Sequence, residues 1–377
     1  MTEIDHYENV RQKLVLGPLS APKNKKIIKL LKIFWNEDEI KILSHFESAD
    51  KWISLKELEE RIGIPKNEIK EKLARSVKIG TIAKKMSKYC LEPIIPGIFE
   101  KYFIRRLDTE ENYIEAAKLY RYIMKKVLPQ AYYETDFQLF QPLLPLEAQE
   151  KLIELNESFD VQSQTLPYET VKNLIDKHDT FAVIPCQCRL IGELTGEPCK
   201  VAPSEMGCFI AGIGAQSYIQ QGFPGAREMN KEEAIEFLKE TEKAGLVHNT
   251  IWDRGNESSL FVCNCCSCHC GSLFPQKLFH SKGAHPSNYE PQFNMELCTK
   301  CETCVRKCPS EAIYHRWPDK SDSSDEKIVL REELCIGCGI CAANCPQDAI
   351  KMKKVRDIIP PERNKLGNKT FLELINE

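Results

Sequence analysis

A run of four cysteines followed by a proline occurs twice near the C-terminal end of the sequence. The two copies share one spacing, Cys298-x2-Cys301-x2-Cys304-x3-Cys308-Pro309 and Cys335-x2-Cys338-x2-Cys341-x3-Cys345-Pro346. Thiols three residues apart allow a short loop to wrap three corners of a cubane, and this spacing is typical of proteins that bind two [4Fe–4S] clusters. The repeat therefore predicts a cofactor, a pair of [4Fe–4S] clusters, and a chemistry, one-electron transfer.

The fourth cysteine of each run is set apart from the other three, and in two-cluster ferredoxins it binds the cluster of the other run. The first cluster is therefore expected to bind Cys298, Cys301, Cys304 and Cys345. The second cluster is expected to bind Cys335, Cys338, Cys341 and Cys308.

Glycines distinguish the second loop from the first. Gly337 and Gly339 remove side chains where the second loop must turn tightly, whereas the first loop has Lys300, Glu302 and Thr303. Cluster potentials follow local charge, hydrogen bonds and exposure. We therefore expect the two clusters to have unequal potentials.

Zinc and disulfide bonds are the alternative uses of so many thiols. Structural zinc usually has two Cys-x2-Cys pairs rather than runs of four, and disulfides are typical of secreted proteins. The N-terminal residues lack the apolar segment of a secretory signal, and no run approaches the roughly 18 apolar residues of a membrane span. The 18 cysteines therefore predict a cytoplasmic protein whose thiols hold metal, and oxygen-labile clusters suggest an anaerobic or microaerobic host.

Length and charge suggest several domains with different partners. A chain of 377 residues is long enough for two or three domains. Residues 1–90 contain 19 lysines and arginines against 13 acidic residues, while the remainder of the chain is acidic. A basic block beside an acidic body favours separate partners for the two parts.

The basic block has the pattern of a winged-helix-like domain, which we place at residues 1–95. Apolar residues predict one or two helices over 26–45, and Ser54 with Glu57 forms a capping box for another. A helix is expected over 66–78, ended by Gly80 and followed by a basic hairpin at 81–88. Helix, short turn, helix and hairpin is the winged-helix order.

The remaining pattern predicts an α+β chain with four further segments. A helical linker region is expected at 96–180, punctuated by Pro167 and containing a helix from Thr109 to about Val127. A cysteine-rich α+β domain is expected at 181–290, with strands at 181–184 and 260–263 and a helix over 231–244 between Asn230 and Gly245. A two-cluster ferredoxin domain at 291–355 and a tail at 356–377 complete the prediction.

A first upstream group contains four thiols in a segment rich in glycine and proline, namely Cys186, Cys188, Cys199 and Cys208. Such a loop is able to fold around a metal, and we expect a third [4Fe–4S] cluster, with a zinc knuckle as the alternative. Arg189 is expected to lie beside the anionic cluster and to favour its reduced form by charge. A surface position for Arg189 is the alternative.

A second upstream group contains five cysteines and a histidine within eight residues: Cys263, Cys265, Cys266, Cys268, His269 and Cys270. If this segment is extended, Cys266, Cys268 and Cys270 share one face while Cys263, Cys265 and His269 share the other. We expect this segment to serve two metal centres, or one further centre and a redox thiol pair. The alternative is one cluster bound by three or four of these cysteines, with the others buried as small apolar residues. Cys90 stands alone and is expected to be structural.

Several catalytic motifs are missing from the sequence. It has no G-x-G-x-x-G, Walker, H-E-x-x-H or G-x-S-x-G motif, and hence no recognisable nucleotide or hydrolytic site. An independent enzymatic activity is therefore not predicted, although a role as an oxidoreductase component stays open.

The chain resembles the four-iron–four-sulfur binding proteins of anaerobic bacteria and archaea that join a winged-helix-like N-terminus to a two-cluster ferredoxin domain. The similar stretches are 98–100, 185–189, 231–248, 263–270 and both cysteine runs. The family tends to have cysteine where this chain has His269. The resemblance implies iron–sulfur electron transfer.

Three functions follow from these patterns. The first is a soluble electron-transfer protein, either a carrier or the wiring subunit of a larger oxidoreductase, with redox proteins as donor and acceptor. The second is a redox-responsive regulator that binds DNA through residues 66–78 and 84–88. The third is an oxidoreductase that binds its substrate at a cluster with an open coordination site.

Overall fold

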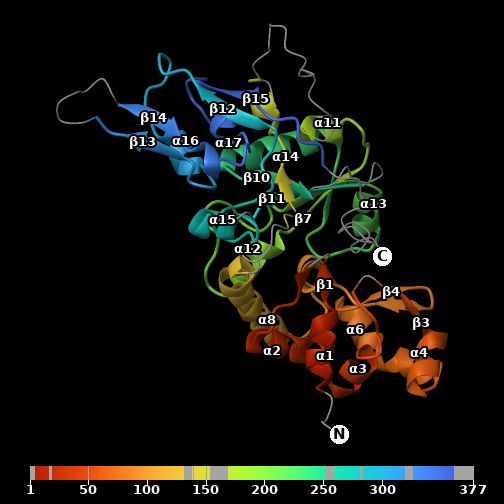
Figure 1. Ribbon diagram of the computed structural model, residues 1–377. Coiled ribbons are helices and arrows are strands. Elements are labelled where there is room, and N and C mark those ends of the chain that lie inside the picture. The colour runs from red at the N-terminus through yellow and green to blue at the C-terminus, as the bar shows by residue number, and fades with distance from the viewer. Residues whose placement is uncertain are drawn as a thin grey trace.

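The computed structural model describes residues 5–16, 19–49, 51–130, 138, 140–149, 151–152, 169–251, 259–280, 283–318 and 326–360. Pro167 of the expected linker and residues 361–377 of the expected tail lie outside these residues. Helices and sheets are mixed, as the α+β class requires. The N-terminal helices lie at one end, a six-stranded sheet lies in the middle, and two small C-terminal sheets lie at the other end (Figure 1).

The N-terminal part is a set of short helices with a three-stranded sheet of order β3-β5-β4. The predicted helix over 66–78 is two helices that meet at Leu73, and the second ends at Gly80, whose φ of +81° suits glycine. Ser54 accepts a hydrogen bond from the Glu57 N–H at 3.2 Å, which is one half of the expected capping box, while the Glu57 carboxylate accepts from Arg61 at 2.7 Å instead. The elements are α1 (His6–Lys13), β1 (Val15–Leu16), β2 (Leu19–Ser20), α2 (Lys25–Phe34), α3 (Glu37–Leu43), β3 (Ile53–Ser54), α4 (Leu55–Ile62), α5 (Lys66–Lys72), α6 (Ala74–Ile79), β4 (Ala83–Lys85) and β5 (Lys88–Cys90).

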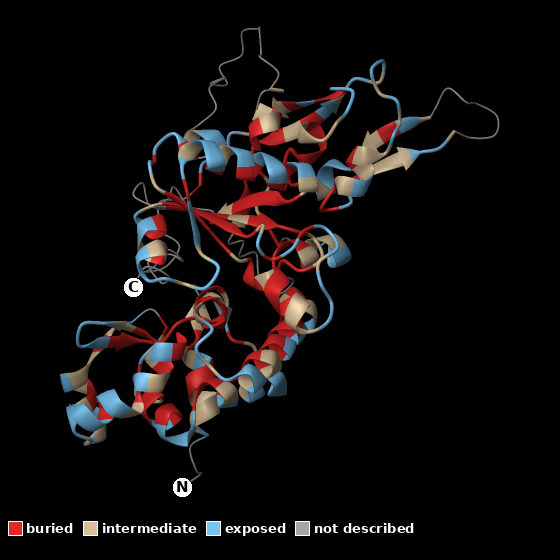
Figure 2. Ribbon diagram, turned by 180° about the vertical axis from the view of Figure 1, so that it is seen from behind, coloured by how far each residue is buried: buried red, intermediate tan, exposed pale blue. Residues whose placement is uncertain are grey.

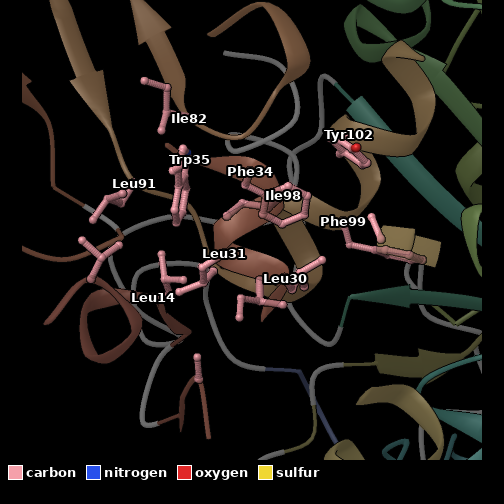
Figure 3. Close-up of a cluster of buried hydrophobic side chains, with 14 of the residues drawn as sticks. Leu14, Leu30, Leu31, Phe34, Trp35, Ile82, Leu91, Ile98, Phe99 and Tyr102 are labelled. Carbon is pink, nitrogen blue, oxygen red and sulfur yellow. The ribbon is translucent and has the colours of Figure 1, made fainter. Parts of the chain in front are cut away.

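One buried apolar cluster holds this part together and continues beyond residue 95. It runs from Val10 to Val127 and reaches Leu190 and Ile191 of the central part. Figure 3 shows side chains of α2 converging in it with Ile82 and Leu91, which flank the β4–β5 hairpin, and with Phe99. The helices that extend the cluster are η1 (Ile94–Ile98), α7 (Phe99–Arg105), α8 (Glu110–Tyr122) and η2 (Ile123–Val127).

The central sheet has the order β6-β10-β11-β8-β7-β9, and every neighbouring pair is antiparallel. Its strands are β6 (Phe140–Pro142), β7 (Phe181–Ile184), β8 (Cys208–Gly212), β9 (Arg227–Met229), β10 (Val247–Ile251) and β11 (Ser259–Cys265). Helix α14 (Lys231–Ala244) packs on one face and α13 (Ile213–Gln220) on the other, because successive residues of the strands alternate between two apolar clusters. The strands are largely buried, as Figure 2 shows.

Short helices flank this sheet. They are α10 (Leu146–Gln149), α11 (Val171–Ile175), α12 (Gln187–Leu194) and α15 (Leu273–Phe279). Helix α12 packs against α8 and so joins the central part to the N-terminal helices (Figure 1). Helix α14 has the predicted bounds, because Asn230 and Glu233 form a reciprocal capping box and Gly245 ends it in a left-handed conformation.

The C-terminal part consists of two antiparallel sheets of two strands each and a compact apolar cluster. Strand β12 (Tyr289–Phe293) pairs with β15 (Ile350–Lys354), and β13 (Ile313–Arg316) pairs with β14 (Lys327–Leu330). Helices α16 (Thr303–Lys307) and α17 (Ile340–Ala343) contact each other beneath them, and η4 (Glu332–Leu334) precedes the second cysteine run. Within the described residues, no helix is both long and apolar enough to cross a membrane.

Candidate metal centres

The first C-terminal thiol set lines a single cavity. Its four cysteines are those expected to share the first cluster, Cys298, Cys301, Cys304 and Cys345. Phe293, Ile328 and Ile350 form part of the wall, and Cys301 is exposed. The cavity therefore combines four convergent thiols, an apolar lining and one edge at the protein surface, which fits an iron–sulfur cluster.

The second C-terminal thiol set is more deeply buried. Burial is the main cause that raises the pKa of the Cys335 thiol to about 11, and the charge of Cys308 adds to it. Burial followed by the charge of Cys308 likewise raises the pKa of Cys338. The charge of Arg356 opposes burial at Cys335 without outweighing it, so this thiol stays protonated until metal binding displaces the proton. The donor chemistry of Cys308, Cys335, Cys338 and Cys341 therefore fits iron.

The two loops share a backbone conformation although their residues differ. Gly337 and Gly339 have φ of +66° and +72°, and Lys300 and Glu302 at the equivalent positions have φ of +57° and +59°. The turn alone therefore does not require glycine. A Cβ at Gly337 would meet the Ser287 hydroxyl and the Tyr289 carbonyl oxygen, so close approach is what excludes a side chain there.

The upstream thiols are grouped differently from their order in the sequence. Three thiols of the first group and four of the second line a cavity of about 60 Å³. One of them, Cys266, also belongs to a second group described below. We name the cavity after the other six and call it the six-thiol cavity, with Cys186, Cys188, Cys208, Cys263, Cys265 and Cys270. The remaining thiol of the first group, Cys199, lies elsewhere.

Strand pairing explains this regrouping. Phe209 of β8 lies opposite Val262 of β11, so Cys208 and Cys263 are brought together and their sulfurs are 3.9 Å apart. Cys186 follows β7 and precedes α12, and its N–H donates to the Ser204 carbonyl at 2.7 Å. Hydrogen bonds from neighbouring thiols, chiefly Cys188 and Cys208, lower the pKa of Cys186.

A second, more compact group lies beside the cavity. The ligand atoms of Cys199, Cys266, Cys268 and His269 all lie within 4.8 Å of one another. We call this group the compact site. Strand β11 ends at Cys265 and the chain then turns, so the expected alternation of faces does not extend over 266–270. Cys266 also borders the six-thiol cavity.

Arg189 lies fully buried near both groups. Its guanidinium donates hydrogen bonds to the carbonyl oxygens of Pro203 at 3.0 Å, Asn264 at 2.7 Å and Met206. Burial alone would lower its pKa, but the charges of Cys186 and Cys266 outweigh burial and raise it. The alternative of a surface position for Arg189 is therefore excluded, and a permanent positive charge lies close to two sets of thiolates.

A buried polar chain, which the sequence patterns did not indicate, continues from Asn264. The Asn264 Oδ1 atom is 2.7 Å from His248 Nδ1, and His248 Nε2 is 3.1 Å from Glu242 Oε1. Glu242 also accepts hydrogen bonds from the N–H groups of Leu146 and Glu147 at 2.7 and 3.2 Å. This chain fixes the strand that carries Cys263 and Cys265 against α14.

Two further polar residues near the cavity were also missed. Asn249 lies opposite Cys263 in the pairing of β10 with β11, and no partner completes a hydrogen bond with its buried amide among the described residues. The pKa of the Cys265 thiol is lowered chiefly by hydrogen bonds from Cys263 and Cys270, and the nearby Asn249 amide adds a smaller effect in the same direction. Glu100 lines the cavity, and burial raises its pKa to about 7 although the Gly97 N–H donates to it at 2.6 Å. Glu100 lies in the stretch 98–100 that carries the family resemblance, so the sequence contained one signal for it. No sequence pattern indicated Asn249.

The thiol sites are joined through the protein core. Cys265 and Cys270 of the six-thiol cavity share a buried apolar cluster with Cys338 of the second C-terminal set, and Leu273, Ile336 and Ile340 lie in the same cluster. The two C-terminal sets share another cluster, which contains Cys304, Cys308 and Cys341. Packed side chains therefore connect all three sites without an intervening solvent layer.

Comparison with known proteins identifies the C-terminal part. Residues 297–350 match the family model described as a 4Fe-4S dicluster domain, and this range contains both cysteine runs. No curated protein matches the chain. The matched range lies within the predicted 291–355 and includes both C-terminal thiol sets. The C-terminal part of the chain is therefore a ferredoxin-type iron–sulfur domain.

Proposed function

We propose that the chain is an electron-transfer protein, a carrier or the wiring subunit of a larger oxidoreductase. In this proposal iron–sulfur clusters are bound by both C-terminal thiol sets and by the six-thiol cavity. The observation that carries it is the shared buried core of Cys338, Cys265 and Cys270. When bound, such clusters supply one-electron transfer. The packed residues between the sites keep water out and hold the sites at fixed positions.

Exposure gives this series of sites a direction from the surface inward. All 18 cysteines lie in the described part of the chain, and Cys301 is the exposed one among them. The second C-terminal set is mostly buried, and the six-thiol cavity, between the central sheet and α12, has no exposed thiol. A redox partner is therefore expected to dock over the first set, near Cys301.

Metal analysis under anaerobic conditions tests this proposal. Four iron atoms per cluster predict about 12 per chain with one cluster in the six-thiol cavity, and about 16 if its six thiols hold more iron. Dithionite-reduced protein is expected to give the EPR signals of reduced clusters. Cys270→Ala should remove about 4 iron atoms, while Cys90→Ala, at a buried thiol remote from the sites, should remove none.

The opposite results would overturn parts of the proposal separately. About 8 iron atoms per chain, unchanged in Cys270→Ala, would show that the six-thiol cavity holds no cluster and that only the C-terminal pair is present. If the protein has its full iron content but accepts no electrons from dithionite, the electron-transfer role itself would be refuted.

The proposed domain layout assigns a winged-helix-like docking unit to the N-terminus. The helices α4 to α6 followed by a β4–β5 hairpin that pairs with β3 support it. Because the apolar cluster continues to Val127, we extend this unit from residue 95 to about residue 130. The linker is shortened accordingly, and the cysteine-rich unit at 181–290 and the ferredoxin domain at 291–355 are retained.

Charge pairing favours a protein partner over DNA for this unit. Three cations of the segment 66–78 are already paired within the protein: Lys66 with Glu59 at 3.3 Å, Lys72 with Asp38 at 2.8 Å and Arg75 with Asp108 at 3.1 Å. Cations already paired within the protein contribute less to phosphate binding. A gel shift with genomic DNA at low salt tests the regulator alternative, and salt-sensitive binding that changes with cluster reduction would favour it.

A further inference from the structure

We propose that Cys199, Cys266, Cys268 and His269 bind one zinc ion, in a structural site separate from the iron–sulfur sites. This inference does not depend on the proposed electron-transfer function. It rests on the size of the site, on the orientation of His269 and on the elements that the four residues join.

The size of the compact site suits a single ion. The four ligand atoms lie within 4.8 Å of one another, with Cys199 Sγ 3.4 Å from Cys268 Sγ and His269 Nδ1 3.2 Å from the same sulfur. Tetrahedral zinc with bonds of about 2.0–2.3 Å separates its ligands by about 3.3–3.8 Å. In a cubane each thiolate binds a different iron, so the thiolates must lie farther apart. The donor set of three cysteines and one histidine is also one that structural zinc uses.

The histidine is oriented as a zinc ligand requires. Its Nε2 atom is 2.9 Å from the Glu197 carbonyl oxygen, which only accepts, so Nε2 carries a proton and Nδ1, on the side of the sulfurs, is the nitrogen available to a metal ion. A backbone carbonyl that accepts from the second ring nitrogen is a common support of metal-bound histidine. Gly192 makes room for this ring, since a Cβ there would lie 2.5 Å from His269 Nε2.

The four residues join separate parts of the chain. Cys199 lies in the loop after α12, while the other three lie in the turn after β11. The Glu197 side chain in the same loop pairs with Arg121 of α8 at 2.5 Å and with Lys125 of η2 at 2.7 Å. A bound zinc ion would therefore fasten this loop between the N-terminal helices and the strand that carries Cys263 and Cys265.

Metal content and X-ray absorption test the proposal on the full-length chain. Anaerobically purified protein is expected to contain one zinc ion per chain that survives treatment with EDTA. The zinc absorption edge should report three sulfurs at about 2.3 Å and one nitrogen at about 2.0 Å. Zinc content near zero, iron in this site, or a shell of four sulfurs would overturn the proposal.

Variants separate this site from the iron–sulfur sites. Cys199→Ala should lose the zinc and keep its iron, whereas Cys270→Ala should lose iron and keep its zinc. Gly192→Ala should weaken zinc retention against a competing chelator by about 10–100-fold, because its Cβ displaces His269. Loss of about 4 iron atoms in Cys199→Ala would assign the thiol to a cluster and refute the zinc site. If Cys199→Ala does not fold, the zinc absorption spectrum of the unaltered protein decides.

Discussion

Arg189 Nη1 donates a hydrogen bond of 2.7 Å to the backbone carbonyl of Asn264, the residue between Cys263 and Cys265. The bond places a permanent cation beside the strand whose cysteines line the six-thiol cavity. Since Cys186 and Cys266 both raise the pKa of Arg189, its charge acts on thiolates of the cavity and of the compact site. A single residue therefore lowers the electrostatic cost of assembling many thiolates in a buried region.

Arg189→Leu is expected to lower the reduction potential of a cluster in the six-thiol cavity by on the order of 50–100 mV. A unit charge removed from about 10 Å away at an effective dielectric constant of about 20 corresponds to this change. Arg189→Lys keeps the charge and loses the forked hydrogen bonds, so it should retain most of the potential. Redox titration followed by EPR measures both variants, and an unchanged potential in Arg189→Leu would contradict the electrostatic role.

Glu242→Gln is expected to destabilise the protein by about 2–3 kcal/mol, because its carboxylate accepts from two backbone N–H groups and contacts His248 in the buried interior. The amide of glutamine would place a donor against those donors. The midpoint of urea unfolding measures the effect. Glu240→Gln on the exposed side of the same helix is the control and should change stability by less than about 0.5 kcal/mol. Equal effects of the two variants would show that the buried chain is unimportant.

Gly337→Ala is expected to release iron from the second C-terminal set, because the added Cβ would collide with Ser287 and with the Tyr289 carbonyl. Lys300→Ala is the matched control at the equivalent position of the first loop, where the backbone has the same left-handed conformation and already carries a side chain. Iron analysis should find about 4 atoms fewer in the glycine variant alone. Retention of iron in both variants would refute the requirement for close approach.

The sequence indicated those features that depend on neighbouring residues. Asn230, Glu233 and Gly245 set the ends of α14 through local hydrogen bonds and a left-handed residue, and the structure has the predicted bounds. The strand at 181–184 was predicted from its apolar run and is present as β7. The iron–sulfur character of residues 297–350 followed from spacing within two short loops.

Features that depend on strand pairing were not predictable from spacing. Cys208 and Cys263 lie 55 positions apart and meet because β8 pairs with β11. Cys199 lies apart from the other three thiols of its group, because the chain turns after Cys265 and places Cys268 next to Cys199. Glu242 and Asn249 take on their roles only when α14 and β10 pack against β11. Leu73 divides the helix expected over 66–78 although the apolar spacing continues through it.

Asn249→Leu is expected to lower the potential of a cluster in the six-thiol cavity by some tens of mV without loss of iron. Its buried amide lies beside the Cys265 thiol and favours the thiolate form, so it is placed to donate to a cluster sulfur. Hydrogen bonds to sulfur stabilise the more negative, reduced state, and one such bond of about 1 kcal/mol corresponds to roughly 40 mV for one electron. Thr250→Val on the same strand is the control, since its hydroxyl donates to the Phe261 carbonyl instead. Equal cluster potentials in Asn249→Leu and Thr250→Val would contradict a hydrogen bond from Asn249 to the cluster.

The two C-terminal clusters are expected to differ in potential, with the first higher because Cys301 is exposed whereas Cys338 and Cys341 are buried. Water stabilises the added negative charge of a reduced cluster, and burial in apolar surroundings opposes it. Glu302 borders the first cavity and its carboxylate is 2.7 Å from His315 Nδ1, so Glu302→Gln removes a negative charge there. This variant should raise the potential of the first cluster by on the order of 10–30 mV, a small change because the site is solvent-screened. The second cluster should not shift, and redox titration resolves the two. A shift of the lower-potential cluster alone would reverse the order assigned here.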